Sequence, residues 1–292
     1  MTLLEVSAWR KLPAWRTVRS CYATVRQNLG QLVRISWLWF LVMVPVYAAT
    51  HWLVSNVWAL PGIQTMPRWV HVIVVVLPLV VELPFLASIA VAWHRLVLRH
   101  EHVSAPAYLR LDTSVWLYVL CSLGFLAVTI GLVLCALPLV GHELLFFPVV
   151  TALIVLSLAV TVFILPRLSL VLPAIALGER LFLWDAWLAT RGNTLRLALA
   201  TCLCMLPALF LIMMLPLLSF LLSMPSWDWT DLEAWTKPIG PNLIDQILDS
   251  IGYAVFDSLA YAVFTILAVT LLSLTYRFFV VPGDDEGAAR PA

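Results

Sequence analysis

The sequence predicts an all-α polytopic membrane protein with six transmembrane helices and short interfacial amphipathic helices. Of its 292 residues, 63% are hydrophobic and 11% are charged, and the mean hydropathy is +0.99, values far outside the range of soluble globular domains. Six apolar stretches are each long enough, at about 20 residues or more, to cross the hydrocarbon core of a bilayer. If each stretch crosses once, 15 of the 17 Lys and Arg residues fall on one side, and this excess marks the cytoplasmic side.

Residues 1–32 predict a cytoplasmic basic arm that contains an interfacial helix. The arm and the start of the first span hold many basic residues but a single acid, Glu5, so this segment resists translocation. The basic residues are Arg10, Lys11, Arg16, Arg19, Arg26 and Arg34. A cleavable signal peptide is the alternative, but its apolar core is only about 7 to 15 residues long, so an uncleaved span is favoured.

The transmembrane domain covers residues 33–281, and residues 282–292 form a cytoplasmic tail. The predicted spans are residues 33–54, 70–98, 115–140, 144–165, 195–224 and 251–281. An even number of spans places both termini in the cytoplasm. Only Arg68 and Lys237 then lie outside, where the loop before the last span collects acids. These acids are Asp228, Asp231, Glu233, Asp245 and Asp249.

A short internal repeat precedes the first and fifth spans. Each copy has an aromatic residue, an Arg four positions later and an Asn six positions later. The copies are Tyr22, Arg26 and Asn28, and Trp187, Arg191 and Asn193. Pro13 and Gly178 weaken helical continuity upstream, so we expect each copy to end a separate short helix in the headgroup plane. The aromatic side chain would then meet acyl chains, and the Arg would meet phosphates.

The second, fourth and sixth spans each place one Arg just inside their cytoplasmic border: Arg95, Arg167 and Arg277. Snorkelling of each guanidinium to a lipid phosphate is one explanation. The alternative is that the three converge on a shared pocket for an anionic headgroup or substrate.

Two carboxylates inside the spans are the strongest functional candidates, because a charge within a bilayer is kept only where it is paired, protonated or wet. Glu82 lies midway along the second span, between Pro78 and Pro84, and Asp257 lies about two turns into the sixth. If they face each other, they could form a proton or cation relay. A neutral Glu82 bonded to a neighbouring helix, with an interfacial Asp257, is the alternative.

Tryptophans cluster near the predicted ends of spans, where an indole keeps its ring in the apolar zone and its N–H among headgroups. We therefore expect them to act as interfacial anchors. They are Trp37, Trp39, Trp52, Trp58, Trp69, Trp93, Trp116, Trp227, Trp229 and Trp235.

Known catalytic signatures are absent from the sequence: it has no phosphate-binding glycine loop, nucleophile elbow or metalloprotease helix. His94, His100, Glu101 and His102 gather after the second span and could bind a transition metal, but a solvated loop is the preferred interpretation. We expect no metal and no cofactor.

Residues 92–98 and 167–180, continuing to 185–193, carry a family resemblance. Here the chain resembles a family of uncharacterised multi-pass inner-membrane proteins of proteobacteria and, more loosely, the membrane domain of some glycerophosphodiester phosphodiesterases. The resemblance implies a six-span helical fold in the bacterial cytoplasmic (inner) membrane. It implies no catalysis, because no soluble phosphodiesterase domain follows these residues.

The favoured function is non-enzymatic: membrane organisation, lipid interaction or service as an accessory subunit. Membrane lipids are the expected partners and nucleic acid is not; a protein partner or a homo-oligomer is left open. The anion-binding candidates are the span-end arginines and the juxtamembrane Arg and Asn pairs. The alternative is a small proton-coupled transporter or channel that uses Glu82. A third hypothesis is a lipid-modifying enzyme with His94 and Glu101 at the cytoplasmic surface.

Overall fold

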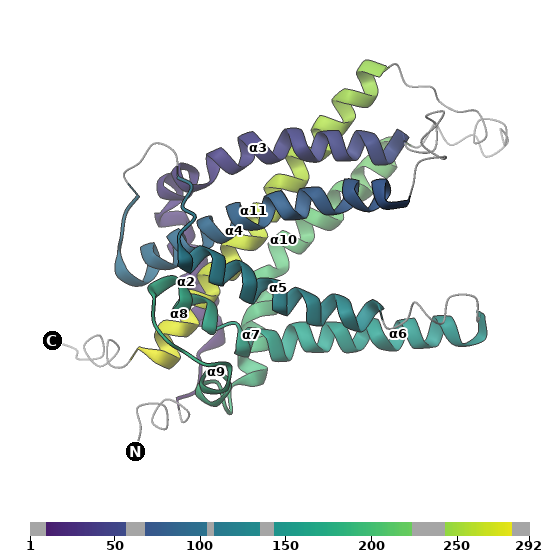
Figure 1. Cartoon of the computed structure of the whole chain (residues 1–292). Helices are drawn as coiled ribbons and strands as arrows, with labels where there is room; N and C mark the ends of the chain where they lie inside the picture. Colours follow the sequence, from purple (N-terminus) through teal and green to yellow (C-terminus); the bar gives the residue numbers. More distant parts are fainter. Residues whose placement is uncertain (1–9, 57–67, 104–107, 135–142, 224–242, 282–292) are drawn as a thin grey trace. The chain divides into compact units, whose positions relative to one another are not determined.

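The computed structural model of this protein describes residues 10–56, 68–103, 108–134, 143–223 and 243–281, and the regular structure within these ranges is helical throughout (Figure 1). The chain divides into two compact units. Unit 1 contains Met1–Ser36, Pro84–Met205 and Thr265–Ala292, and unit 2 contains Trp37–Leu83 and Leu206–Phe264. The predicted tail, 282–292, and residues 141–142 between the third and fourth predicted spans lie outside the described residues.

Five helical segments are long and apolar enough to cross a membrane, so the prediction of a multi-pass helical membrane protein is confirmed. They are Leu29–Leu53, Val80–Arg99, Val149–Leu177, Thr194–Met214 and Ser250–Val280. The helices that contain the predicted spans are α3 (Leu29–Asn56), α4 (Arg68–Arg99), α5 (Thr113–Leu134), α6 (Glu143–Ala159), α10 (Thr194–Ser223) and α11 (Leu243–Val280). In α5 the apolar segment Thr113–Val128 is shorter, so the sixth crossing stays a prediction.

A separate helix, α2 (Ala14–Gln27), precedes α3 in unit 1. It begins directly after Pro13, whose ring cannot continue a helix upstream. Its buried side chains, Thr17, Val18 and Cys21, recur at a spacing of three or four and therefore lie on one face. The segment is thus a short amphipathic helix, as the repeat predicts, although its position in a headgroup layer stays a prediction.

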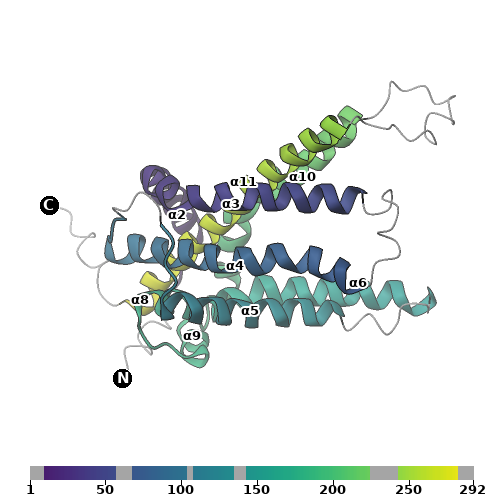
Figure 2. The same cartoon turned by 45° about the horizontal axis from the view of Figure 1, so that its top comes forward.

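In unit 1, α5 and α6 lie side by side in both views (Figures 1 and 2), and α5 also packs against α8 (Val171–Leu177). A single π-helical turn, Val160–Ile164, joins α6 to α7 (Leu165–Leu168). Gly178, with φ +74°, ends α8: the N–H of Glu179 reaches back to the carbonyl of Ala174. Glycine tolerates this left-handed conformation, and the bond satisfies a carbonyl at the helix end.

The described core of unit 1 gathers around the end of α11. Tyr276 and Phe279 pack with Leu12 ahead of α2 and with apolar residues of α8 and α9 (Leu183–Ala189). Trp93 in unit 1 is also buried, with none of its surface exposed, and its Nε1–H donates to Thr270 Oγ1 at 2.7 Å. The prediction that Trp93 anchors at an interface is therefore wrong. The same prediction for Trp39 in unit 2 is also wrong, because Trp39 is buried as well.

Candidate functional site

The most unusual side chain of unit 2 is Glu82, which lies in α4 with only 3% of its surface exposed. A side-chain hydrogen bond joins it to the hydroxyl of Tyr47 on α3. Among the residues that the structure describes, its Oε1 atom has no hydrogen-bond partner. A buried carboxyl that is only half satisfied is costly, so the site calls for a functional explanation.

A chain of polar side chains continues from Glu82 through unit 2. Tyr47 also lies within electrostatic range of Tyr261 and Asp257, both on α11. His51 Nε2 lies 3.8 Å from Asp257 Oδ2, and its ring stacks on Tyr253 with a centroid distance of 5.1 Å. We name this set the polar chain. Its members are Glu82, Tyr47, Tyr261, Asp257, His51 and Tyr253.

Helical spacing explains how these residues come together. Tyr47 and His51 are four residues apart on α3, and Tyr253, Asp257 and Tyr261 follow the same spacing on α11, so each group lines one side of its helix. The sequence singled out Glu82 and Asp257, and the structure brings both into one cluster with Tyr47 between them. Sequence reasoning missed the other four members. Their i, i+4 spacing within apolar stretches was a signal that could have identified them.

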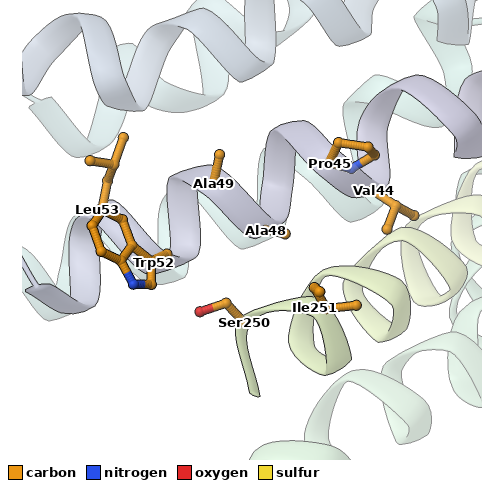
Figure 3. A pocket seen from close by; sticks show the side chains of 8 residues that line it. All are labelled: Val44, Pro45, Ala48, Ala49, Trp52, Leu53, Ser250 and Ile251. Carbon is orange, nitrogen blue, oxygen red and sulfur yellow. The ribbon is translucent and has the colours of Figure 1, made fainter. Parts of the chain in front are cut away.

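Beside the polar chain, unit 2 contains a cavity of about 580 Å³ between α3 and α11 (Figure 3). On the α3 side, Pro45, Ala48 and Ala49 project little into it, and this leaves the space open (Figure 3). The residues that line it are Val44, Pro45, Ala48, Ala49, Trp52, Leu53, Ser250 and Ile251. Its walls are therefore almost wholly apolar.

Arg95, one of the three span-end arginines, and Arg99 one turn further along α4 both bind backbone carbonyls. Arg95 Nε donates to Ala176 O at 2.7 Å, and Arg99 Nη2 donates to Leu177 O at 2.9 Å. Both carbonyls belong to the last turn of α8, where a cation favours the negative end of the helix dipole. Arg95 and Arg99 are one turn apart on α4, so together they hold the end of α8.

Arg167 is buried and lies over the ring of Trp187, with 3.4 Å between Cζ and the ring centroid. Its Nε donates to Thr190 Oγ1 at 2.9 Å, and its Nη2 donates to Trp187 O at 2.8 Å. The guanidinium thus joins α7 to α9 through stacking and hydrogen bonds. Arg277, the third arginine of this group, is exposed at the end of α11.

The two copies of the repeat differ in their surroundings. Tyr22 is half-buried, and its hydroxyl donates to Cys204 O at 2.9 Å, whereas Trp187 covers Arg167. Asn28 donates to Thr24 O within its own helix, but Asn193 is buried and bonds the backbone of Arg10 and Leu12. The remaining pair, Arg26 and Arg191, is exposed. The repeat therefore encodes similar positions but different contacts.

His94 is fully buried, so the expectation that it lies at the surface beside Glu101 is wrong. Its Nδ1 lies 2.7 Å from Ser273 Oγ, and its Nε2 lies 3.3 Å from the Tyr118 hydroxyl. The imidazole thereby ties α4 to α5 and α11. In the part of the chain that the structure describes, no three His, Cys, Asp or Glu residues are grouped so as to hold a metal ion.

Comparison with known protein families, curated proteins and solved structures returns no match for this chain. The chemistry of unit 2 is therefore the basis for a functional argument. Its polar chain combines two carboxyls, an imidazole and phenol hydroxyls in segments long and apolar enough to span a membrane. Such groups accept, hold and pass protons or bind cations.

Proposed function

We propose that the protein is a small proton-coupled transporter or channel whose coupling group is Glu82. The observation that carries this proposal is the Tyr47 hydrogen bond to a buried carboxyl whose other oxygen has no partner among the described side chains. An ionisable group inside a membrane segment is expensive and is kept where it serves an ion or proton path. The Oε1 atom of this carboxyl can take up a proton or accept a hydrogen bond from a ligand.

The polar chain supplies a route away from Glu82. A phenol hydroxyl both donates and accepts, so Tyr47 receives a proton on one side and releases one on the other. Asp257 and His51, 3.8 Å apart, form a second acceptor group at the far end of the chain. Tyr47 lies within electrostatic range of both carboxyls, so it is the group through which a proton would pass between them.

The membrane layout belongs to the same proposal. The helix α5 forms the sixth crossing, both termini lie in the cytoplasm, and the protein resides in the bacterial inner membrane. The distribution of Lys and Arg supports this orientation. Cysteine labelling from each side of sealed vesicles tests it, because labelling of residues 228–233 from the cytoplasmic side would overturn the orientation.

Proton flux into liposomes that contain the purified protein tests the function. A pH gradient and a potassium diffusion potential drive the flux, and an enclosed pH-sensitive dye reports it. We expect Glu82→Gln to lower the flux at least tenfold and Tyr47→Phe to lower it severalfold, because the first removes the proton acceptor and the second breaks the route. The matched control is Glu101→Gln, which neutralises an exposed carboxyl outside the polar chain. Flux that is equal in Glu82→Gln and wild-type protein would overturn the proposal.

Lipid interaction is the second candidate, and α2 is the feature that favours it. Arg16, Arg19 and Arg26 are exposed on this helix, and Trp15 is exposed beside them. A basic amphipathic helix with an exposed indole binds anionic headgroups. Native mass spectrometry of protein extracted with phosphatidylglycerol tests this role: the combined Arg16→Gln, Arg19→Gln and Arg26→Gln protein should retain less of that lipid, and unchanged retention would remove this candidate.

A further inference from the structure

The cavity between α3 and α11 has the dimensions and walls of a ligand site. Its volume of about 580 Å³ lies within the range of small-molecule pockets, about 300–1,000 Å³, and such pockets are mostly apolar with a few polar groups near them. Figure 3 shows the ring of Trp52 and the side chain of Ile251 at its walls. An occupant must therefore present a compact apolar body.

The polar chain continues from the edge of this cavity. Ala48 and Ser250 line the cavity, and His51 and Tyr253 lie three residues further along α3 and α11, on the same sides of those helices. Asp257 is seven residues beyond Ser250, which is two turns, or about 10 Å, along the same side of α11. A ligand with its body in the cavity therefore has a carboxylate within reach of a charged end.

The charge of unit 2 selects the sign of that end. Its described side chains include the carboxyls of Glu82 and Asp257 and no Lys or Arg, so a cation is attracted and an anion is repelled. Three aromatic residues near Asp257, namely Tyr47, Tyr253 and Tyr261, add to the preference, because aromatic rings favour a weakly hydrated cation.

We propose that this cavity binds a lipophilic organic cation, with the apolar body between α3 and α11 and the charge directed to Asp257. Calling that cation the transported substrate rests on the proton-coupled function proposed above. The groups that surround Asp257 are His51 and Tyr47 on α3 and Tyr253 and Tyr261 on α11. The cation and the proton path use the same group of side chains. Exchange of a cation for a proton requires such a shared group.

Calorimetric titration of the purified full chain in detergent tests the site, with tetraphenylphosphonium as the cationic probe and triphenylphosphine oxide as its neutral counterpart. The wild-type protein should bind the cation at least tenfold more tightly than the neutral compound. Asp257→Asn should remove this difference, because it removes the charge and leaves the cavity. Ala48→Phe should weaken binding of both probes at least tenfold by filling the space. Ala152→Phe on the exposed surface of α6 is the matched control and should bind as wild type does.

Each result separates the two proposals, because binding in detergent needs no gradient and flux needs no probe. The cation site is overturned if the wild-type protein does not bind tetraphenylphosphonium or if Ala48→Phe leaves binding unchanged. Neither result bears on the Glu82-dependent flux, which the liposome experiment tests separately. Equal binding of the neutral probe overturns it too, since the cavity would then accept any apolar body, including an acyl chain. Binding without Glu82-dependent flux would keep the site and remove its role in transport.

Discussion

The carboxamide of Asn193 accepts a hydrogen bond from the backbone N–H of Leu12 at 2.8 Å. The same side chain donates from Nδ2 to the carbonyl of Arg10, also at 2.8 Å. A single buried amide therefore satisfies the backbone on both sides of Lys11 and secures the segment that leads into α2. Arg196 adds a bond to Leu12 O at 3.3 Å from the first turns of α10.

Asn193→Ala should destabilise the protein by about 1–3 kcal/mol, because it leaves the buried N–H of Leu12 without its acceptor. The measurement is the free energy of unfolding in detergent, followed by helical signal against denaturant. Asn28→Ala is the matched control from the repeat, since the side chain of Asn28 bonds the nearby Thr24 O at the end of α2. It should cost less than about 1 kcal/mol. Equal effects of the two variants would contradict the structural difference between the copies.

Arg167→Lys should also lower stability, by about 1–3 kcal/mol, although it keeps the positive charge. Lysine has neither the flat guanidinium that stacks on Trp187 nor the fork that reaches Thr190 and the Trp187 carbonyl together. The melting temperature in detergent reports the loss. Arg180→Lys, at an exposed position, should leave the melting temperature unchanged. If both lysine variants melt together with the wild type, the stacking and the fork contribute nothing.

The Cys21 thiol should resist alkylation in the folded protein. Its Sγ lies 3.3 Å from Cys204 Sγ, and both residues are buried. The hydrogen bond with Cys204, together with burial, raises the pKa of Cys21, so little of the reactive thiolate is present. The rate of modification by N-ethylmaleimide, read by mass spectrometry of the Cys21 peptide, checks this.

A matched control moves that thiol by one position. Ser20 is exposed on α2, so Ser20→Cys in a Cys21→Ala background presents an accessible thiol about 100° around the same turn. This control should react at least tenfold faster than Cys21. Similar rates would show that α2 does not hold Cys21 against α10.

Tyr22 should make the protein sensitive to strongly alkaline pH. Burial raises the pKa of Tyr22 from 10.0 to about 12, and the nearby Cys204 and Cys21 add to the effect. A phenol whose pKa is raised on folding stabilises the fold while it is neutral. Its contribution is complete below pH 10 and is lost as the pH rises through about 12.

The stability difference between wild type and Tyr22→Phe isolates this residue from the other groups that titrate. Below pH 10 the wild type should be more stable by about 0.5–1.5 kcal/mol, because its hydroxyl bonds the Cys204 carbonyl. The difference should shrink between pH 10 and 12. A difference that stays constant over that range would contradict the buried position of the hydroxyl.

The helices could be predicted from the sequence because hydrocarbon tolerates a backbone only when its hydrogen bonds are satisfied internally, so long apolar stretches have almost one option. The start of α2 at Pro13 and the end of α8 at Gly178 were also predictable, since proline and glycine act through local backbone geometry. Trp93 was not. An indole near the end of an apolar stretch fits an interface and a packed core equally well, and only the partner Thr270, far away in sequence, decides between them.

The candidate site was predictable only in part for a related reason. A carboxylate in an apolar stretch is conspicuous, so Glu82 and Asp257 were found. Tyr47 and His51 are ordinary residues for a membrane helix, and their importance depends on how α3 is rotated relative to α4 and α11. Rotation about a helix axis is set by tertiary packing, which local composition does not encode.

The π-helical turn at Val160–Ile164 changes which side of its helix faces inward. One surplus residue in a turn offsets everything downstream by about 100° around the axis. The outward strip of α6, with Ile154, Val155 and Leu158, therefore does not continue into α7, where Pro166 and Arg167 are buried. Removing one residue from this turn would restore an unbroken spiral and swing Arg167 out from beneath the Trp187 ring, so the irregularity keeps that stack in phase.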